Sequence, residues 1–152
     1  TGRSEDADTL LRQAVGVDST FAMAWRKLAV VLPQAGNFGA AEASDAAKRA
    51  YQFRDRLPAV ERGLTEAYYH NIVTGDQEKT EAAYRAVLAV NPDEPTSLNN
   101  LGLMLTAQGK AAEAEPLLRR LVRTTPMQSG LLNLFTALDA QGKTAAADSV
   151  LA

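Results

Sequence analysis

Five glycines recur along the chain at nearly constant spacing, and this repetition restricts the possible folds more than any other feature. They are Gly2, Gly36, Gly75, Gly109 and Gly142, separated by 34, 39, 34 and 33 residues. A fixed period of roughly 20 to 50 residues is the signature of a stack of structural repeats. The sequence therefore predicts repeated units that pack on their neighbours, rather than one central core.

Apolar and small residues recur in register with these glycines. Three positions before each of the last four glycines are apolar, namely those eleven, eight and four residues before the glycine. Asn71 is the single exception. Five residues after the glycines the side chains are small: Ala7, Ala41, Thr80, Ala114 and Ala147. Since residues three and four apart share one face of a helix, the pattern predicts a helix on each side of every glycine.

The stretch from Pro95 to Pro126 contains one whole unit, PTSLNNLGLMLTAQGKAAEAEPLLRRLVRTTP. Gly109 can adopt the positive φ of a tight turn between two helices, and Pro126 cannot continue the second helix. This unit resembles a complete tetratricopeptide repeat, and the residues at the family's pattern positions are Leu98, Leu101, Gly102, Leu105, Ala114, Leu118 and Pro126. The resemblance covers essentially the whole chain. It implies an all-α fold, a right-handed superhelical stack of antiparallel helix pairs.

The glycine spacing also predicts the boundaries of the units. We expect a single solenoid fragment with a half repeat at 1–19, repeats at about 20–57, 58–92 and 95–126, and a partial repeat at 127–152. The long interval between Gly36 and Gly75 adds about five residues, which we place in a second helix over 38–54 whose extra turn projects before Pro58. Both ends are interpreted as cut from a longer repeat array or a larger protein.

A second resemblance concerns the segments FAMAWRKLAV and RDRLPAVERGLTEAYYHNIVTGD. They are similar to bacterial repeat arrays appended to serine/threonine kinases and transcriptional regulators. The chain has neither a kinase glycine-rich loop nor an HRD-type loop, so no kinase activity follows from this likeness.

The family normally binds peptides on the concave face, which is lined by the first helix of each pair. By register, the resemblance implies a groove formed by Arg26, Lys27, Tyr69, Asn99, Asn100, Leu103, Asn133 and Thr136. Asn100 and Asn133 occupy equivalent places one unit apart, and an amide can both donate to and accept from a peptide backbone. This is similar to the asparagine ladder of sugar-transferring family members. The alternative is that these asparagines are simply polar residues of an exposed groove.

A second device of the family is a carboxylate clamp that grips the C-terminus of a peptide. Only Arg26 fits it, since Val30 and Thr96 replace the required Asn and Lys, and Glu66 would repel the ligand. The sequence therefore disfavours the clamp. Arg26 and Lys27 could still attract an acidic segment, although two cations on a helix more often form a solvated face.

The sequence offers little for catalysis, metals, nucleic acid or membranes. It has one histidine, no cysteine, and no H-E-x-x-H or G-x-S-x-G motif. His70 with Glu66 is the nearest pair to a catalytic dyad, and we expect a surface hydrogen bond there. We predict no enzyme activity, no cofactor and no metal. The net charge of −2 gives no field for nucleic acid, and no apolar run is long enough for membrane insertion.

These observations predict a non-catalytic scaffold for protein–protein interaction that binds a short peptide segment in its concave groove. The alternative is a structural spacer or oligomerisation module of a larger regulatory protein, which contacts its partners, or another copy end to end, through uncovered ends. The compartment stays open, with a cytoplasmic location favoured.

Overall fold

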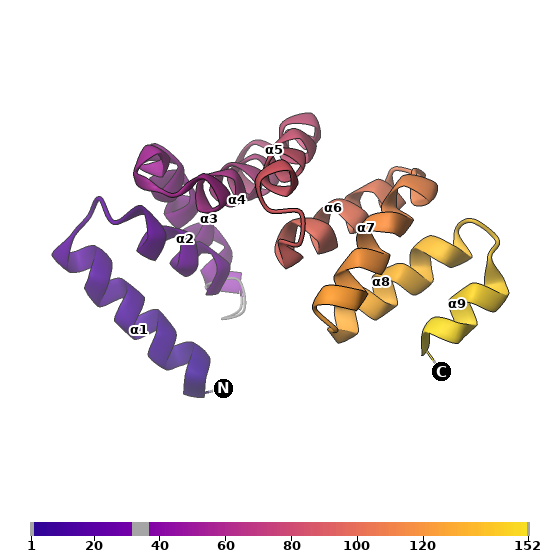
Figure 1. The fold of residues 1–152 in the computed structure, drawn as a ribbon. Helices are drawn as coiled ribbons and strands as arrows, with labels where there is room; N and C mark the ends of the chain where they lie inside the picture. Colours follow the sequence, from indigo (N-terminus) through magenta and orange to yellow (C-terminus); the bar gives the residue numbers. More distant parts are fainter. Residues whose placement is uncertain (1, 32–36, 152) are drawn as a thin grey trace. The chain divides into compact units, whose positions relative to one another are not determined.

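The computed structural model describes residues 2–31 and 37–151, and every regular element within these ranges is helical. The predicted all-α fold of antiparallel helix pairs is confirmed (Figure 1). No helix in the described ranges is both long and apolar enough to cross a membrane. The chain forms two compact units, Thr1–Ala83 and Tyr84–Ala152, and the boundary falls inside one helix, α5.

Unit 1 begins with a single helix, and helix pairs follow. Its elements are α1 (Gly2–Val17), α2 (Ala22–Val31), α3 (Asn37–Gln52), the short 3₁₀ helix η2 (Arg54–Arg56), α4 (Ala59–Tyr69), the π turn η3 (His70–Thr74) and the start of α5 (Gln77–Val90). Neighbouring helices pack in chain order, α1 on α2, α2 on α3 and α3 on α4. This nearest-neighbour packing is typical of a repeat protein.

The core of unit 1 is built from small residues. Leu28 and Ala29 of α2 pack with Ala43, Ala46 and Ala47 of α3, and all five are at most 3% exposed. Because these alanines have no long side chain, α2 and α3 can approach closely. Tyr68 of α4 packs against the same cluster and donates a hydrogen bond from its hydroxyl to the carbonyl of Ala29, at 2.7 Å.

The buried face of α3 differs from the one that the glycine spacing predicts. Ala41, five residues after Gly36, is exposed, whereas Ala43, Ala46, Ala47 and Ala50 are buried. The extra residues of the long glycine interval therefore lie before the buried positions of α3. They do not lengthen the C-terminal end of this helix. Leu32, Pro33 and Gly36, on which part of the prediction depended, lie outside the described residues.

The extra turn expected to project before Pro58 is also absent. Helix α3 ends at Gln52, and the following residues form η2, after which Leu57 is buried at 8% exposure. Ionic and polar contacts hold this turn: Arg54 Nε lies 3.3 Å from a carboxylate oxygen of Glu66, and Arg56 donates to the hydroxyl of Thr20. The segment before Pro58 is therefore packed against other residues of unit 1.

A π turn explains the one break in the apolar pattern. Helix α4 continues directly into η3, which ends at Thr74 and is capped by Gly75 with a φ of 67°. A π turn widens the helix locally, so the side chains that follow it change face. Asn71 is accordingly exposed, and Val73 packs against the Leu28 cluster in its place.

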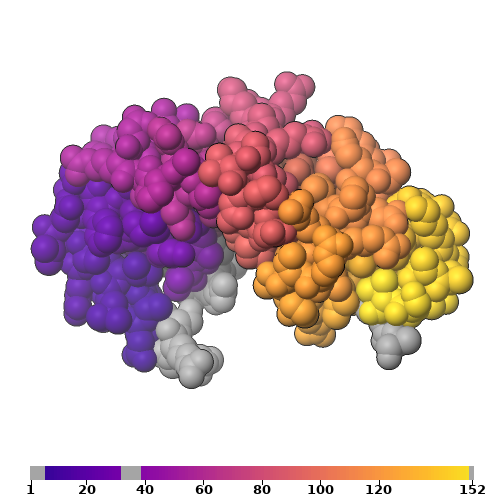
Figure 2. Space-filling model, viewed as in Figure 1, coloured from indigo at the N-terminus to yellow at the C-terminus, as the bar shows by residue number. Residues whose placement is uncertain are grey.

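Unit 2 follows the predicted pattern closely. After the end of α5 come α6 (Pro95–Ala107), α7 (Ala111–Thr124), α8 (Gln128–Asp139) and α9 (Thr144–Leu151). Each helix packs on the next, and α6 also contacts α8, as first helices of successive repeats do. In Figure 2 the orange and yellow atoms of α7, α8 and α9 follow one another in chain order. Pro116 lies in the second turn of α7 without ending the helix.

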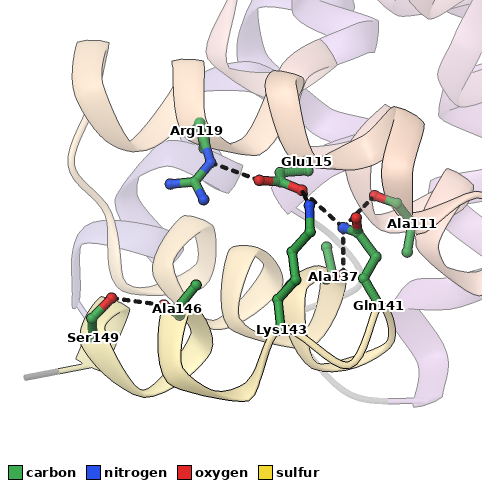
Figure 3. A network of polar contacts seen from close by, with 8 residues as sticks. All are labelled: Ala111, Glu115, Arg119, Ala137, Gln141, Lys143, Ala146 and Ser149. Atoms are coloured by element: carbon green, nitrogen blue, oxygen red, sulfur yellow. Dashed lines mark hydrogen bonds and ion pairs between the residues drawn. The ribbon is translucent and has the colours of Figure 1, made fainter.

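Glu115 on α7 is the centre of a polar network that holds the α8–α9 turn (Figure 3). Its side chain is 14% exposed and receives hydrogen bonds from Lys143 Nζ at 2.6 Å, Arg119 Nε at 2.9 Å and Gln141 Nε2 at 3.0 Å. The Gln141 amide also donates to the carbonyls of Ala111 and Ala137. These donors, that of Lys143 first, lower the pKa of Glu115 from its ordinary 4.5 to about 2.

This lowered pKa predicts that the Glu115 contacts weaken in acid. Because the pKa is lower in the folded chain, the stabilisation is complete above about pH 4.5 and is lost as the pH falls toward 2. Lys143 and Arg119 are about half exposed, so we expect about 1–2 kcal/mol rather than the full value of the shift. Glu115→Gln should therefore lower the unfolding free energy by that amount at pH 7, as measured by urea titration.

At about pH 2 the Glu115→Gln variant and the natural chain should be nearly equal in stability. The matched control is Glu113→Gln, since Glu113 is 49% exposed and pairs with Arg85 at the surface. We expect it to change the unfolding free energy by less than about 0.5 kcal/mol. A Glu115 effect that is the same at both pH values would show that the network does not depend on the carboxylate charge.

Candidate functional site

A chain of hydrogen-bonded side chains connects the helices that were expected to line the groove of unit 2. Asn133 of α8 donates from Nδ2 to Oδ1 of Asn99 on α6, at 3.0 Å. Asn99 donates to Oδ1 of Asn100 at 3.1 Å, and Asn100 donates to the hydroxyl of Tyr84 on α5 at 3.0 Å. Three asparagines and one tyrosine thus form a single polar line across three helices, which we call the amide chain.

The start of α6 fixes where these amides lie. Glu94 is 7% exposed and caps the helix, accepting from the backbone N–H of Thr96 at 3.1 Å and of Ser97 at 2.6 Å. Pro95 occupies the first turn, where its missing N–H costs nothing. Leu98 and Leu101 are fully buried, and the intervening Asn99 and Asn100 are half-buried.

Burial raises the pKa of the Tyr84 phenol, and the carboxylate of Glu94 adds to the rise, while the hydrogen bond from Asn100 opposes it. The phenol is therefore neutral near pH 7. Tyr84 was not predicted as a site residue. Its hydroxyl is contacted by Asn100, 16 positions along the chain, and the repeat spacing used to predict groove residues gives no information on such a contact.

The amides keep some hydrogen-bonding capacity. Each carboxamide has two N–H donors and one oxygen, and each of these asparagines uses one N–H within the amide chain. Among the described residues the oxygen of Asn133 receives no hydrogen bond. All three asparagines are half-buried, so the remaining groups can reach a ligand or water.

Apolar side chains flank the amide chain. Leu103, one turn after Asn99 on α6, is 49% exposed, and Leu132, next to Asn133 on α8, is 48% exposed. Thr136 is exposed one turn after Leu132 and donates its hydroxyl proton to the Leu132 carbonyl at 2.9 Å. We call these two leucines, Thr136 and the amide chain together the α6–α8 face. It brings together five predicted site residues: Asn99, Asn100, Leu103, Asn133 and Thr136.

Arg26, Lys27 and Tyr69, the other predicted site residues, belong to unit 1. Arg26 on α2 is largely buried, with 11% of its side chain exposed, and forms an ion pair with Glu61 on α4. Its charge is therefore compensated within unit 1. Lys27 is exposed. The partner of Arg26 lies 35 positions away, beyond the reach of a local motif.

Tyr69 is part of an aromatic cluster next to the π turn. Its ring stacks on that of Tyr51 from α3, with centroids 3.9 Å apart and an interplanar angle of 15°, and His70 meets both rings edge-on. The guanidinium of Arg54 covers the Tyr51 ring at 4.0 Å. One face of Tyr69 is therefore used within unit 1.

The expected hydrogen bond between His70 and Glu66 is not formed. Glu66 pairs with Arg54, and His70 Nδ1 lies 3.3 Å from the hydroxyl of Thr74 in the π turn. The backbone N–H of His70 still bonds to the carbonyl of Glu66, so the helical spacing is kept between these two residues, and the Glu66 carboxylate is paired with Arg54 instead. No group of three or more His, Cys, Asp or Glu side chains within residues 2–31 and 37–151 is placed to hold a metal ion.

Comparisons with known proteins agree on the type of repeat. A family model described as tetratricopeptide repeat matches residues 1–55 and 75–128. Cellulose synthase 1 operon protein C from Komagataeibacter xylinus is 27% identical over 126 residues, which cover 78% of this chain and 10% of that protein. The chain thus spans about a tenth of the length of this relative.

Two solved structures have similar folds. The crystal structure of MamA protein superposes with a TM-score of 0.64 at 14% identity, covering 99% of this chain and 80% of that one. A tetratricopeptide repeat protein from Parabacteroides merdae gives a TM-score of 0.61 at 16% identity, covering 98% and 58%. Identities this low show a shared fold and nothing about ligands.

Proposed function

Because the chain belongs to the tetratricopeptide repeat family, whose fold is generally a non-catalytic scaffold for protein–protein interaction, we propose that its α6–α8 face holds a short extended segment of a partner protein. The amide chain is the observation that supports this proposal. Its three asparagines are half-buried, and each keeps donors or acceptors beyond those it uses internally.

The amide chain suits an extended peptide for geometrical reasons. An extended backbone presents N–H and C=O groups at regular intervals, and it can pair with side-chain amides whatever its own sequence. The internal hydrogen bonds hold Asn99 and Asn133 in place before a ligand arrives, so less side-chain entropy is lost on binding. The face is small, and we expect micromolar affinity, about −8 kcal/mol.

The proposal is tested with a peptide-array screen of the intact chain, followed by calorimetry with the best peptide. The double variant Asn99→Ala with Asn133→Ala should weaken binding about tenfold, since it removes hydrogen bonds worth about 0.5–1.5 kcal/mol each. Asn71→Ala is the matched control, because this asparagine is exposed on the π turn of unit 1. It should leave the affinity unchanged.

An unchanged affinity in the double variant, with circular dichroism showing an intact fold, would exclude the amide chain as the binding site. Binding that is lost through substitutions of Lys27 and Tyr69 instead would place the site in unit 1.

The second candidate function is a spacer or oligomerisation module, and α1 provides the observation that favours it. Leu10 and Val17 on this helix are 64% and 91% exposed. Apolar side chains this exposed can be covered by a second copy of the chain. Light scattering distinguishes the two functions: a dimer that Leu10→Ser with Val17→Ser disrupts would support self-association.

A further inference from the structure

The two helices of the α6–α8 face are almost free of charge. Helix α6, PTSLNNLGLMLTA, contains no charged residue, and α8, QSGLLNLFTALD, contains only Asp139 at its last position. Both have mainly apolar or neutral polar side chains. By contrast, α7 between them in sequence, AAEAEPLLRRLVRT, has five charged residues.

The charges that border these helices are largely paired with one another. Arg85 and Glu113 lie 3.0 Å apart, Arg120 and Asp93 lie 2.6 Å apart, and Glu115 is paired with Arg119 and Lys143. The carboxylate of Glu94 is buried and accepts from two backbone N–H groups of α6. These pairings belong to α5, α7 and the turns, so apart from Asp139 at the end of α8 the two helices offer a ligand neutral amides and leucines.

An uncharged face selects its ligand by exclusion. A charged side chain placed against Leu103 and Leu132 would lose water without gaining an ionic partner, which is unfavourable. A neutral backbone loses little, because the amides replace its hydrogen bonds to water. An apolar side chain gains, because it covers two half-exposed leucines and is itself removed from water.

We propose that the α6–α8 face binds an uncharged extended segment whose aliphatic or aromatic side chains cover Leu103 and Leu132, and that it discriminates against acidic and basic segments. This inference rests on the proposed function and adds the chemical class of the partner. It differs from the expectation of an acidic ligand based on Arg26 and Lys27, since the charge of Arg26 is compensated by Glu61 in unit 1.

The test uses three synthetic peptide libraries of equal length and equal leucine content. One is filled with Ser, Thr, Asn and Gln, one with added Asp and Glu, and one with added Lys and Arg. Binding to the intact chain is measured by fluorescence polarisation at about 0.1 M and about 1 M salt, where the Debye length is about 10 Å and 3 Å. The neutral library should bind at least about tenfold more tightly than either charged library, with less than about a twofold change between the two salt concentrations.

Two variants locate the selectivity. Leu103→Lys should weaken binding of the neutral library about tenfold and strengthen binding of the acidic one. Ala112→Lys is the matched control, since it adds the same charge at an exposed position of α7, and it should leave binding of the neutral library unchanged.

The outcomes separate this inference from the proposed function. If a charged library bound most tightly, and its binding were lost in the Asn99→Ala with Asn133→Ala variant, the inference would be overturned and the proposed function would stand. A neutral preference that Leu103→Lys does not change would also overturn it. Binding of no library, or binding that ignores both Leu103 and the amides, would overturn both. A Leu103-dependent dimer without peptide binding would show that the face takes a second copy of the chain.

Discussion

Replacing Leu101 with alanine is expected to lower the unfolding free energy by about 2–5 kcal/mol. Leu101 has no exposed surface, and it lies between the fully buried Leu98 and Leu105 on the packed face of α6. Truncation would remove apolar contacts with the neighbouring helices and leave a cavity that rigid helix pairs cannot fill. Urea unfolding followed by far-ultraviolet circular dichroism measures the effect, since this signal reports the helices of both units, whereas the single tryptophan, Trp25, lies in unit 1 and Leu101 in unit 2.

Leu103→Ala is the matched control in the same helix. It deletes the same atoms from a side chain that is already 49% exposed, so we expect a loss of less than about 1 kcal/mol. Similar losses for the two variants would show that the helix register of α6 is wrong, and the assignment of Leu103 to the α6–α8 face would fail with it.

Gly102→Ala is expected to be destabilising by about 1–3 kcal/mol, although alanine is the better helix former by about 1 kcal/mol. A Cβ atom at this position would lie 2.6 Å from both Cγ and Cδ2 of Leu118 on α7. Leu118 is fully buried, so its side chain would have to shift within the packed core. The glycine thus sets how closely α6 and α7 approach, and thermal unfolding measures the change.

Gly16→Ala provides the control for Gly102, because a Cβ atom at this helical glycine of α1 meets nothing within 4 Å. It should be neutral or stabilising by up to about 1 kcal/mol. In a Leu118→Ala background the cost of Gly102→Ala should largely disappear, since the clashing atoms are gone. If Gly102→Ala were tolerated as well as Gly16→Ala, α6 and α7 would not be packed as closely as described.

The helix pairs could be predicted because the turn glycines have a physical requirement. Gly75, Gly109 and Gly142 all have positive φ, between 67° and 76°, which other residues rarely adopt. Spacing alone, however, did not locate the surplus residues between Gly36 and Gly75. Helix α3 has small residues on several faces, so Ala41 and Ala46 fit the pattern equally well, and only packing against α2 distinguishes them.

The arrangement of the candidate site could be predicted in part, for a related reason. Register placed Asn99, Asn100 and Asn133 on first helices, because a helical face follows from sequence spacing. Their hydrogen bonds to one another and to Tyr84 join helices of successive repeats, and such contacts depend on the distance between helices. The same holds for Arg26, whose expected role as a groove cation did not take account of Glu61 on the next first helix.

Methyl NMR of the intact chain, titrated with the tightest peptide from the array screen, tests the central claim most directly. Leu103 and Leu132 are half-exposed on the α6–α8 face, whereas the more exposed Leu10 and Val17 lie on α1. Binding to the α6–α8 face predicts saturable shifts of the Leu103 and Leu132 methyl signals, with those of Leu10 and Val17 unchanged. Shifts confined to Leu10 and Val17 would contradict it.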